Sequence, residues 1–276
     1  MAIILLGGSA LVAVSRPGPH PGHSQGTDIL HFFIQEEMLN DGVLTNASGV
    51  VLAEHNQQGH SDHQQLSLLV SGLETNSPYA LYGQVGDDTN LTWVADFSTD
   101  GAGRAALRYG NFGHGHGMGL RKAPDGGMGH GIGHGMGGGP GSLQSPVPAQ
   151  LDPVNRILEL EVVDSSTQAV LTADFTMPDT LRYLVKRNLS TNDVDASLRI
   201  HATTHFTQFR LFADGLNAQQ EYWLVLNGSV AETNTADSGG RLMFDSLPDD
   251  VTNILDVWSL ALWDSASNVV LRTDLP

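Results

Sequence analysis

Histidine and methionine alternate with glycine in one stretch of the chain, residues 110–141. Fifteen of its 32 residues are glycine, and the residues between include four histidines and three methionines. Imidazole nitrogen binds copper, zinc and nickel, whereas thioether sulfur is soft and selects Cu(I). The mixed donor set therefore predicts a transition-metal site that favours copper over zinc or nickel. The candidate ligands are His114, His116, Met118, Met128, His130, His134 and Met136.

The order of these residues predicts two ligand-bearing arms joined by a turn. Side chains of an extended chain alternate between two faces, so the ligands of each arm project from the same side. A Pro-Asp-Gly sequence between the arms favours a turn, because proline presets φ and glycine accepts positive φ. If the chain folds back there, Met118 lies opposite Met128. In the same register His116 lies opposite His130. The alternative interpretation is a flexible spacer whose histidines only face water.

A second histidine group lies in the sequence EHNQQGHSDH, which supplies His55, His60 and His63. Their local density makes them second-tier metal ligands, and they could share a site with the glycine-rich arms. The second half of the chain carries His201 and His205 at the corresponding place. Apolar residues alternate with His201, so we expect its side chain to point to solvent. Surface histidines without a ligand are the alternative interpretation of this group.

The elements that must position these residues are predicted to be β-strands. Short alternating runs separated by turn residues begin at residue 29 and continue to the end of the chain. The second half repeats the first: LLVSGL and then Tyr79 match LFADGL and then Tyr222, and DGAGR at 100–104 matches DSGGR at 237–241. Each copy contains about the strand content of one β-sandwich of about 100 residues. The predicted fold is all-β, with two tandem β-sandwich (Ig-like) domains from an internal duplication.

The predicted first domain spans 29–176 and the second spans 178–276, with the boundary at Met177-Pro178-Asp179, where proline interrupts strand pairing. First-domain strands are expected near 29–35, 49–55, 66–71, 79–84, 91–97, 103–109, 157–163 and 168–175. Second-domain strands are expected near 181–187, 197–202, 206–213, 221–227, 229–234, 240–245, 255–263 and 268–275.

Aligning the two copies places the glycine-rich tract in a long loop, 110–149, inserted between the last two strands of the first domain. The first copy is about 37 residues longer than the second over this interval. A loop of this length on a rigid scaffold is usually functional or disordered. The insertion is therefore the expected functional element.

Composition excludes several classes of protein. The chain has 13 basic and 30 acidic residues and a net charge of -17, so nucleic acid is not an expected partner. It contains no cysteine, which excludes disulfides, thiolate zinc sites, iron–sulfur clusters and cysteine nucleophiles. The sequence also lacks a Gly-x-Ser-x-Gly elbow, a phosphate-binding loop and a dinucleotide fingerprint. We assign no catalytic and no organic-cofactor-binding residues.

The N-terminal residues 1–15 resemble a signal peptide, and 16–28 form a Pro/Gly/His linker. Residues 2–14 are an apolar run that is too short to span a bilayer but has the length of a signal-peptide core. The run lacks the positively charged residues that normally precede such a core. The pattern predicts a secreted, periplasmic or cell-surface protein without a transmembrane segment.

Three functions fit these expectations, and the first is favoured. It is a secreted, non-enzymatic protein that binds copper through the inserted loop. The first alternative is a cell-surface structural or adhesive protein whose glycine-rich tract and open sheet edges support self-association or a surface partner. The second alternative is a copper-dependent oxidase, although a flexible glycine-rich loop is a poor preorganised catalyst.

Overall fold

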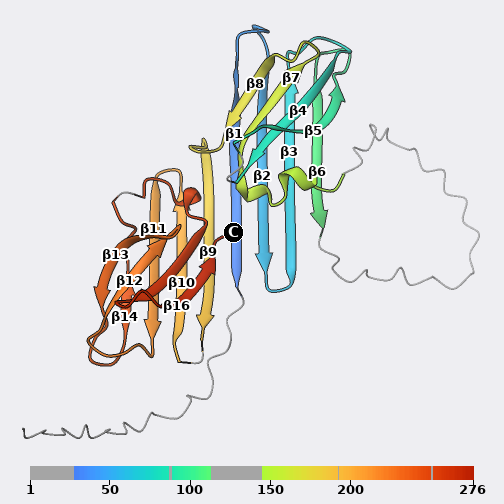
Figure 1. Ribbon diagram of the computed structural model, residues 1–276. Helices are drawn as coiled ribbons and strands as arrows, with labels where there is room; N and C mark the ends of the chain where they lie inside the picture. The colour runs from blue at the N-terminus through green and yellow to red at the C-terminus, as the bar shows by residue number, and fades with distance from the viewer. Residues whose placement is uncertain (1–27, 87–88, 113–144, 192, 250) are drawn as a thin grey trace, which may run out of the picture.

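The computed structural model of the protein describes residues 28–86, 89–112, 145–191, 193–249 and 251–276. Over these residues the chain is all-β, with sixteen strands and three short 3-10 turns. Each predicted strand overlaps a strand of the structure, which confirms the all-β fold class (Figure 1). All seven predicted metal ligands of the glycine-rich tract, and the register proposed for its arms, lie outside the described residues.

Eight strands precede residue 175. They are β1 (Ile29–Asn40), β2 (Ser48–Gln58), β3 (Ser61–Ser71), β4 (Pro78–Val85), β5 (Thr92–Ser98), β6 (Ala105–Phe112), β7 (Ile157–Asp164) and β8 (Ala169–Asp174). Two of the 3-10 turns, η1 (Ala149–Leu151) and η2 (Val154–Arg156), lie between β6 and β7.

Eight further strands follow residue 179. They are β9 (Thr180–Ser190), β10 (Asp195–Thr203), β11 (Phe206–Asp214), β12 (Glu221–Leu226), β13 (Ser229–Thr235), β14 (Leu242–Phe244), β15 (Ser259–Asp264) and β16 (Val269–Asp274). The turn η3 (Ile254–Asp256) precedes β15. The predicted strand 255–263 is therefore wrong at its beginning, because a helical turn occupies that sequence and Trp258 lies just outside the strand.

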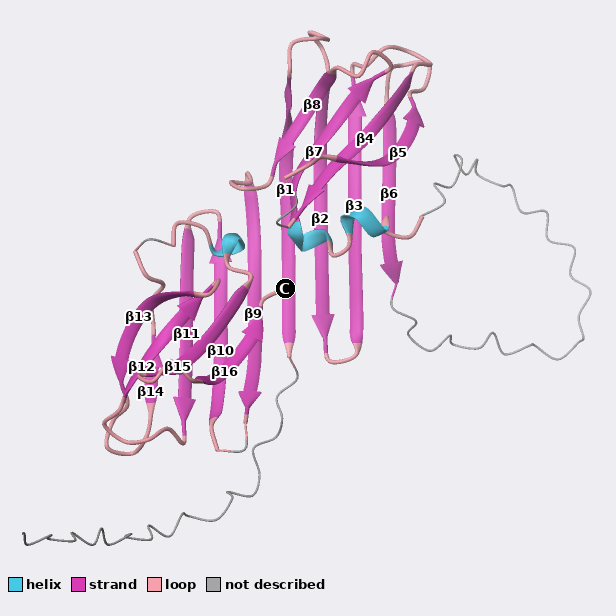
Figure 2. Cartoon of the chain, viewed as in Figure 1, coloured by secondary structure: helices cyan, strands magenta, loops and turns pink. Residues whose placement is uncertain are grey.

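The strands form a 12-stranded and a 4-stranded sheet. One continuous run, β14-β11-β10-β9-β1-β2-β3-β6, extends through both halves of the chain. The strands β8-β7-β4-β5 join it through the end of β1 and lie across the first half, and the separate sheet β13-β12-β15-β16 lies across the second half (Figure 2). The buried apolar side chains lie between these layers.

Strand β1 shows why the sequence folds in this way. Its inward side chains Leu30, Phe32 and Ile34 are at most 2% exposed, while the residues between them face outward. β1 pairs antiparallel with β9, and Phe32 lies directly opposite Tyr183 at the middle of the pairing. Their rings meet edge to face, with centroids 6.3 Å apart, and burial raises the pKa of Tyr183. The two halves of the chain are thus joined by a shared sheet and a shared aromatic contact.

Corresponding turns of the two halves make the same hydrogen bonds. Asp100 and Asp237 each accept, through Oδ1, a hydrogen bond from the backbone N–H four residues later at 2.9 Å. These backbone hydrogen bonds are the largest cause of the lowered pKa of both carboxyl groups. Tyr79 and Tyr222 each accept, through the hydroxyl oxygen, a hydrogen bond from the backbone N–H five residues earlier at 3.0 Å. The matching sequence blocks therefore adopt matching local structures.

Candidate functional site

The described residues define both ends of the glycine-rich tract. β6 ends at Phe112, and Ser145 forms a parallel bridge with Tyr109 of the same strand. The N–H of Gly110 donates to the carbonyl oxygen of Ser145 at 2.9 Å. The N–H of Val147 donates to Oδ1 of a further β6 residue, Asn111, at 3.0 Å. The chain therefore leaves and re-enters the fold at one place, the end of β6.

Two second-tier histidines belong to the β2–β3 hairpin beside that place. β3 pairs with β6, and His63 lies opposite Phe112, the last described residue before position 113. His63 is half-buried, and His60 is exposed in the turn between β2 and β3. The pairing of β3 with β6 thus places His63 beside the end of β6, while His60 lies in the hairpin turn three residues earlier.

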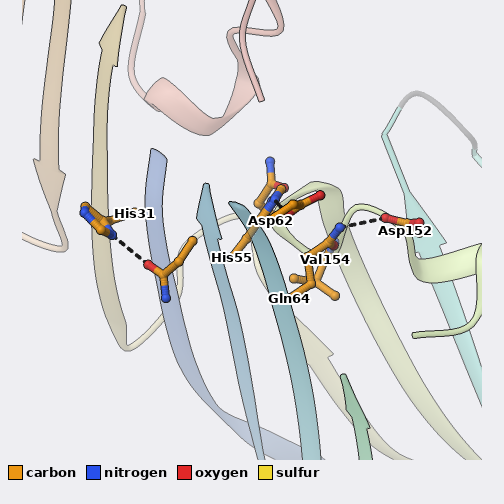
Figure 3. Close-up of polar contacts among 8 residues, drawn as sticks. His31, His55, Asp62, Gln64, Asp152 and Val154 are labelled. Carbon is orange, nitrogen blue, oxygen red and sulfur yellow. Dashed lines mark hydrogen bonds and ion pairs between the residues drawn. The ribbon is translucent and has the colours of Figure 1, made fainter. Parts of the chain in front are cut away.

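The remaining second-tier histidine, His55, lies on the opposite face of this hairpin and is only 5% exposed. Its Nδ1 is hydrogen-bonded to Oδ1 of Asn155, and its Nε2 lies 2.8 Å from Oδ1 of Asp62 (Figure 3). Both ring nitrogens are engaged, so no lone pair is free for a metal ion in this arrangement. His55 acts here as a structural link between β2 and the η2 turn.

Gln64 makes a second link beside it and is 4% exposed. Its Nε2 donates to Oδ1 of Asp152 at 2.9 Å, and its Oε1 accepts from the N–H of Val154 at 2.9 Å (Figure 3). With His55, Gln64 fastens the segment that leads from the tract to β7 onto the inner face of β2 and β3. Gln64, Asp152 and Asn155 were not predicted as site residues from the sequence. The signal for Gln64 was its position two residues before the buried Leu66, on the core-facing side of an alternating strand.

The structure does not gather the described histidines into a ligand set of their own. Across the residues it describes, no group of three or more His, Cys, Asp or Glu side chains could hold a metal ion. In the second half, His205 is exposed. His201 is half-buried and on the outward side of its strand, where its ring meets Phe206 edge to face at 5.3 Å.

A small cavity of about 200 Å³ lies where the halves meet. The first half contributes Asn155 and Arg156, and the second contributes Asp256 and Trp258. The Nδ2 of Asn155 is buried without a hydrogen-bond partner among the described residues, and burial raises the pKa of Asp256. The cavity therefore places one basic side chain, Arg156, and one acidic side chain, Asp256, near Asn155, the hydrogen-bond partner of His55.

Comparison of the chain with protein-family models, curated proteins and solved structures finds no match. Among the described residues, none of the helical segments has the length and apolar character needed to cross a membrane.

Proposed function

We propose that this protein binds a transition metal, preferentially copper, through the glycine-rich tract carried by its first half. The observation that carries the proposal is the alternation of histidine and methionine with glycine in the tract, because imidazole and thioether together match copper. The described fold adds a rigid base: the chain leaves from the end of β6 and returns beside it, next to His63 of the neighbouring hairpin. His60 and His63 remain second-tier candidate ligands, whereas His55 serves to hold the base in place.

We infer that the scaffold arose by internal duplication into two sandwich-like halves, of which only the first received the insertion. Support comes from the matched turns at Asp100 and Asp237 and from the antiparallel pairing of β1 with β9. Phe32 and Tyr183 occupy equivalent positions in the two aligned copies, and they also lie opposite each other in the β1–β9 pairing. A two-fold axis between the halves produces this arrangement. We further propose that the chain is exported, on the basis of the apolar run at residues 2–14.

Separate removal of the two ligand types tests the proposal. One variant replaces the four tract histidines His114, His116, His130 and His134 with asparagine, and a second replaces Met118, Met128 and Met136 with leucine. We expect the histidine variant to lose Cu(II) binding and the methionine variant to lose mainly Cu(I) affinity, because thioethers prefer Cu(I). Competition titrations with chromogenic chelators measure both. Variants that both bind copper as the parent protein does would contradict the proposal.

Acid should weaken the site, since imidazole must be neutral to bind a metal. Histidine has an ordinary pKa near 6.5, so we expect copper affinity to fall below about pH 6. Chelator competition repeated at about pH 7 and about pH 5 measures the change. Equal affinity at both pH values would show that thioethers, and not imidazoles, dominate the site.

A further inference from the structure

The outward face of β9, β10 and β11 is basic, although the protein as a whole is strongly acidic. These three neighbouring strands carry five of the 13 basic residues of the chain, and their acidic residues lie only at the ends, at Asp195 and Asp214 (Figure 1). The five basic residues are Arg182, Lys186, Arg187, Arg199 and Arg210. Arg187 points to the other side, where its Nη1 donates to Oγ1 of Thr273 at 2.8 Å.

Three of these cations lie in one row across the strands. Lys186 pairs directly with Arg199, and Arg199 pairs directly with Arg210. All three side chains are exposed, and neighbouring strands are about 4.8 Å apart. Like charges placed directly opposite one another destabilise a sheet. The row therefore costs the fold some stability.

Among the residues that the structure describes, no carboxylate forms an ion pair with the row of Lys186, Arg199 and Arg210. The nearest acidic residue on β11, Asp214, lies 3.6 Å from the guanidinium of Arg241 instead. The three exposed cationic side chains can therefore bind an external anion.

The fold itself does not require this row. In the first half, the corresponding positions of β1, β2 and β3 are Gln35, Leu52 and Ser67, which pair with one another in the same way. These neutral residues build an equivalent part of the same sheet. Packing or strand formation therefore does not explain why the second half carries cations here.

Aromatic rings lie on the same face, four residues along the strands from the row. The guanidinium of Arg182 lies over the ring of Phe33, 5.8 Å from its centroid. Phe206 is 48% exposed and lies at the beginning of β11. An exposed ring on the same face as planar cations can pack against the apolar face of one sugar of a polymer while the cations bind acidic groups of other sugars.

We propose that this basic face binds a linear polysaccharide that carries carboxylates, with the polymer lying across strands β9 to β11. The arginine fork suits a carboxylate, and a row of cations about 4.8 Å apart suits charges repeated along a polymer. Duplex nucleic acid fits less well, because it carries about one charge per 1.7 Å of its axis and a protein with a net charge of -17 repels it more strongly than a polysaccharide with one carboxylate per sugar.

The test is calorimetric titration of the full chain with polygalacturonate at low and at physiological ionic strength. The test variant is K186Q/R199Q/R210Q. The matched control is R104Q/R241Q/R272Q, which removes three exposed basic residues elsewhere and so changes the net charge equally. We expect the parent and the control to bind, and the test variant to bind at least about tenfold more weakly. Fully methyl-esterified polygalacturonate, which lacks the charges, should not bind.

Three outcomes would overturn the proposal: equal binding by test and control variants, no binding of polygalacturonate by the parent at low salt, or tighter binding of polyglutamate or single-stranded DNA than of polygalacturonate. Misfolding does not obscure the result, because removing opposed like charges should leave the melting temperature unchanged or raise it. If the melting temperature of the triple variant falls below that of the parent, the single variant Arg199→Gln, from the centre of the row, replaces it. This variant should bind polygalacturonate more weakly than the parent.

Discussion

Replacing Phe32 with alanine is expected to destabilise both halves of the protein together, by about 3–5 kcal/mol. Phe32 is 2% exposed, and its ring meets that of Tyr183 at the middle of the β1–β9 pairing. The truncation removes core contacts of the first half and the aromatic contact with the second. Because one sheet runs through both halves, we expect a single unfolding transition whose midpoint shifts to lower temperature in the variant.

Thermal unfolding followed by circular dichroism and by tryptophan fluorescence measures this effect. Trp93 reports on the first half, and Trp223 and Trp263 report on the second. The matched control is Phe33→Ala, the neighbouring phenylalanine on the outward, half-buried side of β1, which should cost about 1 kcal/mol or less. Two separate transitions, of which only the first shifts in Phe32→Ala, would refute the coupling of the halves.

Replacing His55 with alanine is expected to cost about 2–4 kcal/mol, because it leaves a cavity and a buried amide oxygen on Asn155 without its partner. His60→Ala, in the exposed turn of the same hairpin, should change stability by no more than about 0.5 kcal/mol. Chemical denaturation of the metal-free proteins measures both. If His55 were a surface ligand and not a structural link, the two variants would be equally stable.

The second half of the chain suggests a rescue of this variant. Ala202 pairs with Tyr183 as His55 pairs with Phe32, and Leu255 stands at the aligned position of Asn155. Apolar residues therefore stand at both of these positions in the other half. The double variant His55→Ala/Asn155→Leu should be more stable than His55→Ala alone, because no buried polar group is left unpaired. Additive losses would show that the two residues do not act as a pair.

Local periodicity was sufficient to predict the strands, because alternation of apolar and polar residues reports directly which face of a strand is buried. Leu30, Phe32 and Ile34 were recognisable in this way. Periodicity does not identify the neighbour of a strand, so the pairing of β1 with β9 could not be predicted. The helical turn Ile254–Asp256 was missed because three residues are too few to show a period.

Residue types suggested the candidate ligands, but they did not indicate how the described histidines are packed. The position of His55, two residues after the buried Ala53, already placed it on the core side of its strand, yet its residue type suggested a ligand. Its partner Asn155 lies in a segment without periodicity, 100 residues away in sequence, and only the folded chain brings the two together. The bridge between Ser145 and Tyr109 of β6 also joins residues distant in sequence, so it could not be predicted from local pattern.

Copper binding by the tract is tested by a Cu(I) titration of two proteins. One is the parent chain, and the other has residues 113–144 replaced by a Gly/Ser sequence of equal length, which preserves the closure between Phe112 and Ser145. We expect saturable copper binding by the parent and its loss in the replacement variant, with unchanged circular dichroism in the β region. Equal copper binding by the two proteins would contradict the claim.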